Sequence, residues 1–147
     1  MKIGVINGPN INILGKREVS IYGKESWDKI EEKLKLLGKT LNLELLFYQS
    51  NHEGEIVDYI QTHMDDLDGI IINPAAFSKT GYSILDAINA NNLPYIEIHL
   101  SNIFFRGGWH SESIFTEDAI GFIGGLQGYG YELALRGIHQ FLDCQKE

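Results

Sequence analysis

Two pairs of side chains in this 147-residue sequence could move protons. Glu97 and His99 stand two residues apart in the apolar stretch YIEIHL, so on a strand they share one face. A carboxylate beside an imidazole stabilises the protonated ring and fixes its orientation, which makes His99 a candidate general acid. For this pair alone, a strand-end histidine satisfied by its neighbour is the simpler interpretation.

Arg17 and Tyr22 form the second pair, five residues apart in the stretch NGPNINILGKREVSIYG. A tyrosine titrates near ~10 in water, so a tyrosine base at neutral pH needs a nearby cation to stabilise its phenolate. A guanidinium can supply that stabilisation. Without other information, the preferred interpretation is a tyrosine packed at the base of the loop and a solvated arginine.

The stretch that carries this second pair, residues 7–23, is long for a connection and has no helical apolar period. Connections of this length inside a compact domain are usually functional or disordered. Isoleucines and a leucine are spaced among its polar residues, which suggests that it folds down over something. We interpret it as a lid that carries a base.

Metal and cofactor sites are less favoured by the sequence. Glu97, His99 and either His52 or His110 could contribute ligands, but they lack the spacing of known zinc motifs. The glycines of residues 121–130 lack the G-x-G-x-x-G and Walker patterns, so tight turning and close packing explain them better. We therefore expect neither a metal nor a cofactor.

The elements that must position these residues alternate between strand and helix about five times. Such alternation predicts an α/β fold with a parallel sheet covered by helices on both faces, in a flavodoxin-like five-stranded order. One domain is expected over residues 1–147. The expected strands are 2–7, 43–49, 69–73, 95–100 and 119–126, and the expected helices are 27–41, 55–64, 80–91 and 129–142.

Ligands of open α/β sheets bind beyond the carboxyl ends of the strands. The segments at or just past those ends should therefore converge on one pocket. Besides residues 7–23, the chain has a second long irregular segment in this region, residues 101–116. No single spacing shows this convergence, which follows from the topology. The segments are 7–22, 49–53, 73–80 and 99–106.

The charge and the cysteine content of the sequence restrict which binding partners and which cellular compartment are expected. The net charge of −8 argues against binding a nucleic-acid backbone, while a small anionic substrate remains possible in a local basic pocket. The single cysteine, Cys144, fits a reducing compartment. Neither a signal peptide nor a membrane-spanning run is present in the sequence, so we expect a cytoplasmic protein without a membrane partner.

Several ordered motifs resemble one known family, the type II 3-dehydroquinate dehydratases. They are GPNINILGKREVSIYG, FYQSNHEGEIVDYIQ, INPAAFS, IEIHLSNIFFR and GFIGGLQGYGYELALRGI, and they span nearly the whole chain. The resemblance implies a flavodoxin-like fold and loss of water from 3-dehydroquinate through an enolate, without a metal or cofactor. It also implies a homo-oligomer built from trimers, typically a dodecamer.

The resemblance also implies catalytic roles. Tyr22 matches the base that removes the C2 proton, and Arg17 matches the arginine that keeps this base ionised. Asn10 matches the asparagine that helps to hold a water near the enolate. His99 matches the acid that protonates the leaving C1 hydroxyl, with Glu97 as its orienting partner.

Further positions match the family's substrate-binding shell. Asn73 is implied on the substrate's hydroxyl side, and Leu100 and Ser101 at its carboxylate. Arg106 matches an arginine near the site, and Asp86 an aspartate that reaches a neighbouring subunit's site.

The sequence departs from the family pattern inside this shell. Ala75 replaces a glycine, Lys79 a histidine that binds substrate hydroxyls, and His110 a substrate-binding arginine. Gly107 and Gly108 replace two acids, and Leu85 an arginine before Asp86. A site built to hydrogen-bond hydroxyls discriminates strongly, so these changes could shift substrate choice by orders of magnitude.

Three functions therefore stay open. The leading one is dehydration of 3-dehydroquinate, in biosynthesis or catabolism. The second is a divergent enzyme that eliminates water from a related cyclic hydroxy acid. The third is a non-catalytic oligomeric binding protein, against which the presence of Tyr22, Arg17 and His99 counts, since a binder needs no poised base.

Overall fold

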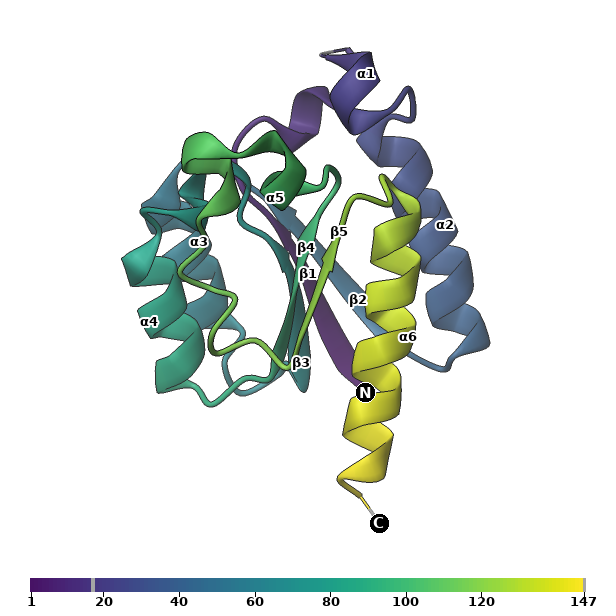
Figure 1. Cartoon of the computed structure of the whole chain (residues 1–147). Helices are drawn as coiled ribbons and strands as arrows, with labels where there is room; N and C mark the ends of the chain where they lie inside the picture. Colours follow the sequence, from purple (N-terminus) through teal and green to yellow (C-terminus); the bar gives the residue numbers. More distant parts are fainter. Residues whose placement is uncertain (17, 147) are drawn as a thin grey trace.

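A five-stranded parallel sheet runs through the computed structural model, which describes residues 1–16 and 18–146. The strand order is β2-β1-β3-β4-β5, which confirms the flavodoxin-like α/β prediction (Figure 1). The sheet changes direction of winding between β1 and β3, where such folds bind ligands. The strands are β1 (Lys2–Asn7), β2 (Glu44–Gln49), β3 (Gly69–Asn73), β4 (Tyr95–His99) and β5 (Gly121–Gly124).

Helices cover both faces of the sheet. α2 (Trp27–Thr40) and α6 (Tyr129–Cys144) lie on one face, and α3 (Glu53–Thr62) and α4 (Tyr82–Ala90) on the other (Figure 1). Each places an apolar stripe against the sheet, as Ile30, Leu34 and Leu37 do in α2. The central strands β3 and β4 are buried along their whole length, which explains their continuous apolar runs.

The carboxyl ends of β1 and β3 approach each other closely. Asn7 pairs with Asn73 in the ladder, and the next amide, that of Gly8, donates to the Asn73 carbonyl at 2.8 Å. A Cβ atom at Gly8 would lie 2.3 Å from the carbonyl oxygen of Pro74, so this approach requires a glycine. Two polar side chains thus meet side by side at the edge of the sheet.

Short helices occupy the two segments that were predicted to be irregular. Residues 7–23 contain η1 (Ile11–Ile13) and α1 (Val19–Tyr22), and residues 101–116 contain α5 (Ile103–Arg106) and η3 (Gly108–Ser111). A further turn, η2 (Ala75–Ser78), follows β3. Helices of three or four residues are too short to show an apolar period, so the sequence pattern missed them.

The ends of several elements also differ from prediction. α3 begins two residues earlier than expected, at Glu53, and the edge strand β5 is shorter than the expected 119–126 because it pairs with β4 only from Gly121 to Gly124. Among the described residues, no helix combines the length and apolar character needed to cross a bilayer.

Candidate active site

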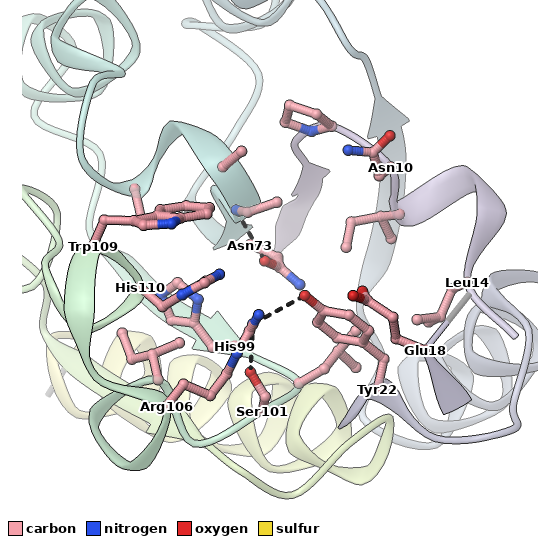
Figure 2. Close-up of a pocket in the computed structure, with 17 residues that line it drawn as sticks. Asn10, Leu14, Glu18, Tyr22, Asn73, His99, Ser101, Arg106, Trp109 and His110 are labelled. Atoms are coloured by element: carbon pink, nitrogen blue, oxygen red, sulfur yellow. Dashed lines mark hydrogen bonds between the residues drawn. The ribbon is translucent and has the colours of Figure 1, made fainter. Parts of the chain in front are cut away.

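A cavity of about 280 Å³ opens at the carboxyl edge of the sheet, bounded by the η1–α1 segment, η2 and the α5–η3 segment (Figure 2). The topological rule therefore located the pocket, with one difference. Residues 49–53 do not line it, and Asn51 instead accepts the backbone N–H of Asn10 at 2.9 Å. The predicted residues that do line it are Asn10, Tyr22, Asn73, Ala75, His99, Leu100, Ser101, Arg106 and His110.

Glu97 and His99 lie on the same face of β4 and contact each other. Glu97 is fully buried and His99 nearly so, and His99 Nε2 is 2.7 Å from Glu97 Oε1. The Ser113 and Thr116 hydroxyls also donate to the carboxylate, each at 2.5 Å. The Glu97 bond occupies Nε2 and fixes the ring, so Nδ1 is the nitrogen left for a ligand.

The surroundings of Glu97 keep it ionised. Burial alone would raise the pKa of its carboxyl, but the hydrogen bonds from His99, Ser113 and Thr116 outweigh burial and hold that pKa below its ordinary value. The buried anion is therefore a fixed negative charge behind the imidazole, where it stabilises a protonated ring.

The lowered pKa predicts how stability depends on pH. Because the folded-state pKa of Glu97 lies below the unfolded value of ~4.3, its contribution is present at neutral pH and is lost as pH falls through the folded value. Near neutral pH, the free energy of unfolding of Glu97→Gln should be about 1–3 kcal/mol lower than that of the wild type. Denaturant titrations at several acidic pH values should show a shallower acid loss in the variant, and identical acid profiles would contradict this.

Tyr22 meets Arg106 across the cavity. Arg106 Nη1 donates to the Tyr22 hydroxyl oxygen at 2.9 Å, and the guanidinium carbon lies 5.4 Å from the ring centroid (Figure 2). The same nitrogen lies 3.4 Å from the Ser101 hydroxyl. A cation thus faces the tyrosine oxygen from α5. Arg17, for which the sequence predicted this place, lies outside the described residues.

Among the described residues, three non-glycine residues of the cavity wall have positive φ angles: Asn10 (68°), Glu18 (27°) and Ala75 (50°). Such conformations cost roughly 1 kcal/mol or more each and concentrate at functional sites. At Ala75, where the resemblance implies a glycine, a glycine would adopt this φ without the cost.

Lys79 was expected in the substrate shell, but it does not line the cavity. Its ammonium is 2.6 Å from Glu112 Oε2, and both side chains are about half exposed, at 47% and 58%. The neighbouring Ser78 lines the cavity instead. The carboxylate of Glu112 draws the lysine outward, a contact between residues 33 positions apart that no local pattern shows.

Removing Lys79 should therefore change turnover little. Exposed ion pairs contribute about 0–1 kcal/mol, so Lys79→Ala should change kcat/KM by less than about fivefold. The measurement is a steady-state assay of the reaction proposed below, with Glu112→Ala as the matched control that removes the other partner. If kcat/KM fell by two or more orders of magnitude in Lys79→Ala but not in Glu112→Ala, Lys79 would have to contact the substrate.

Two other predicted positions lie away from this cavity. Asp86 is exposed on α4 beside a shallow groove between α3 and α4, and Leu85 packs against the apolar cluster under the same helices. Neither side chain touches the cavity of its own chain.

Among the wall residues that sequence reasoning did not single out are a carboxylate, Glu18, and an indole, Trp109. Trp109 stacks on His110 with ring centroids 3.7 Å apart, and both point from η3 toward the cavity (Figure 2). Trp109 and His110 follow Gly107 and Gly108, which have φ angles of 64° and 60°. A Cβ atom at either glycine would have no neighbour within 4 Å. The only hint in the sequence was that Glu18 follows Arg17 and Trp109 precedes His110, two residues that were singled out.

Metal ligands are not grouped in the part of the chain described. Across residues 1–16 and 18–146, no set of three or more histidine, cysteine, aspartate or glutamate residues is placed to hold a metal ion. The groups that meet in the cavity are proton donors and acceptors: a phenol, two imidazoles, a guanidinium, a carboxylate, hydroxyls and amides.

Comparison with known proteins gives one consistent result. The family model of class II dehydroquinases matches residues 1–139. A 3-dehydroquinate dehydratase of Prochlorococcus marinus subsp. pastoris is 47% identical, covering 97% of both chains, and one of Campylobacter jejuni is 48% identical, covering 97% of this chain and 90% of the relative. The crystal structure of the type II dehydroquinase from Butyrivibrio crossotus superimposes with a TM-score of 0.90 at 40% identity, covering 94% of this chain and 97% of that one.

Proposed function

Because the chain belongs to the class II dehydroquinase family, we propose that it dehydrates 3-dehydroquinate to 3-dehydroshikimate through an enolate. The observation that carries the proposal is the meeting of Tyr22, Arg106 and the Glu97–His99 pair around one cavity. An elimination of water needs a base for the proton, an acid for the hydroxyl and a way to stabilise the charge between them.

Tyr22 is the proposed base, which takes the C2 proton and leaves an enolate. The hydrogen bond from Arg106 supports this role, because a guanidinium beside a phenol oxygen stabilises the phenolate. Arg17 is assigned the same task by the family motif. Asn10, at the start of the lid, is proposed to help hold a water that donates to the enolate oxygen.

His99 is the proposed acid. With Nε2 engaged by Glu97, the Nδ1 proton of the imidazolium passes to the departing C1 hydroxyl, which leaves as water while the electron pair of the enolate forms the ring double bond. Glu97 never touches the substrate in this scheme. It acts as a positioning residue that holds the ring and its charge.

The remaining wall residues are proposed to bind the substrate. Ser101 and the backbone amides of Leu100 and Ser101 suit the carboxylate, beside the cation of Arg106. Asn73, the backbone at Ala75 and His110 suit the hydroxyl groups of the ring.

One observation favours a second candidate within the same chemistry. The Trp109–His110 stack forms part of the wall where the family pattern places an arginine, so the enzyme could prefer a related cyclic hydroxy acid. An imidazole and a guanidinium offer different donors, and such differences discriminate strongly between hydroxylated substrates.

The test is a steady-state assay with 3-dehydroquinate that follows the conjugated enone product by ultraviolet absorbance. Turnover with a kcat/KM in the ordinary enzyme range of about 10⁴ M⁻¹s⁻¹ or more supports the leading proposal. If folded protein shows no turnover, a binding screen of cyclic hydroxy acids would test the second candidate.

The proposal extends to assembly and location. We propose a homo-oligomer built from trimers, up to a dodecamer, and the exposed position of Asp86 on α4, outside its own cavity, supports a role at a neighbouring subunit's site. Light scattering coupled to size-exclusion chromatography measures this mass directly. A cytoplasmic location is proposed because the lone cysteine, Cys144, is exposed as a free thiol, which suits a reducing compartment.

A further inference from the structure

A buried chain of polar side chains lies beneath the cavity floor. The Asn73 amide nitrogen donates to the Tyr131 hydroxyl at 2.8 Å, and this hydroxyl donates to Asn7 Oδ1 at 2.6 Å. Asn7 and Tyr131 are fully buried and Asn73 is 2% exposed. This polar chain joins the ends of β1 and β3 to the first turn of α6. Of its three residues, Asn73 is the one that lines the cavity.

The direction of these hydrogen bonds follows from one backbone group. The Ala75 N–H donates to Asn73 Oδ1 at 3.2 Å, which places the Asn73 amide nitrogen at the other end, toward Tyr131. The phenol oxygen therefore accepts, and its single proton is left for Asn7. If the Asn7 amide were reversed, that phenol proton would face a second donor and have no acceptor.

Tyr131 is suited to hold this arrangement without changing charge. Burial raises the pKa of its phenol, with a smaller opposing effect from the Asn73 hydrogen bond, so the proton stays on the oxygen. The ring packs edge-on against Trp27 with centroids 5.2 Å apart, which fixes the position of the hydroxyl. Among the described residues, the Asn7 Nδ2 atom has no hydrogen-bond partner, a cost that proteins accept mainly at functional sites.

We propose that Tyr131 is a positioning residue that acts through Asn73. It holds the Asn73 amide so that the second N–H of this side chain faces the cavity as a donor to an oxygen of the substrate (Figure 2 shows Asn73 on the cavity floor). The floor thus offers a fixed donor, which selects an acceptor oxygen at this point of the ring. The inference rests on the proposed function and adds a residue that does not itself line the cavity.

The test is a double-mutant cycle of Tyr131→Phe and Asn73→Ala, measured as kcat and KM with 3-dehydroquinate. Tyr131→Phe should raise KM by about 2- to 10-fold, the value of one hydrogen bond, with a smaller change in kcat. In the Asn73→Ala background, the same substitution should change KM by less than about twofold. Equal effects in both backgrounds, or an unchanged KM in the single variant, would overturn the proposal.

A control separates positioning from loss of stability. Ile138→Val removes a methyl group from the buried face of the same helix and takes no hydrogen-bonding group from the polar chain. Ile138→Val should lower Tm without raising KM, because it leaves every hydrogen-bonding group of Asn7, Asn73 and Tyr131 in place. If Tyr131→Phe does not fold, Asn7→Ala, which removes the acceptor of the phenol proton, should raise KM in the same way, and an unchanged KM there overturns the proposal.

Crystal structures of the wild type and Tyr131→Phe decide the inference independently of turnover. The Asn73 amide should rotate or become disordered when the phenol oxygen is removed, whereas an unchanged amide overturns the proposal. Absence of turnover in the wild type would count against the proposed function, and the Asn73 conformation would still decide the role of Tyr131.

Discussion

Replacing Tyr22 by phenylalanine is expected to lower kcat for 3-dehydroquinate dehydration by about 10²- to 10⁴-fold, the usual contribution of a general base. The variant keeps the ring that packs in the cavity and removes only the oxygen that Arg106 contacts. Because this oxygen is proposed to take the C2 proton, KM should change much less than kcat.

The matched control is Tyr59→Phe, which removes a phenol oxygen from α3, where the ring stacks on Tyr48 away from the cavity. This variant should keep wild-type kcat. Steady-state rates of the three proteins, each checked for an unchanged fold by circular dichroism, make the measurement. Retention of more than about a tenth of wild-type kcat in Tyr22→Phe would remove the tyrosine from the role of base.

Replacing His99 by asparagine should also lower kcat by about 10²- to 10⁴-fold, because the variant lacks the proposed proton donor to the C1 hydroxyl. The expected defect differs in kind from that of Tyr22→Phe. In the proposed mechanism, removal of the C2 proton precedes loss of the hydroxyl, so an enzyme without its acid can still form the enolate and return it to substrate.

Deuterium exchange separates the two variants. In D₂O, His99→Asn should exchange the C2 proton of 3-dehydroquinate for deuterium, which NMR of the recovered substrate would detect. Tyr22→Phe should not catalyse this exchange. The reverse pattern would exchange the assignments of acid and base. Exchange in neither variant would show that His99 is also needed for the first step.

The fold was predictable because its signals are long and local. Five apolar strands alternating with amphipathic helices determine a parallel sheet, and β3 was located to the residue since its apolar run ends at Pro74. The short helices η1, α1, α5 and η3 were not predictable in this way, because three or four residues cannot display a period.

The site was predictable in outline and not in its contacts. The topology brought Tyr22, Asn73 and His99 to one edge, and they line the same cavity. The Arg106–Tyr22 bond joins residues 84 positions apart, and its existence depends on how α1 and α5 are placed around the cavity. Lys79 shows the limit most clearly, since its neighbours in sequence place it at the pocket while Glu112 holds it outside.

The polar chain beneath the floor spans almost the whole polypeptide, since Tyr131 and Asn7 are 124 positions apart. β1 and β3, which carry Asn7 and Asn73, leave the ribosome before α6, which carries Tyr131. The floor cannot be completed until α6 docks on the sheet, and contacts between such distant residues require a large loss of loop-closure entropy before they form. A growing chain can therefore build most of its sheet before the floor of its site is complete.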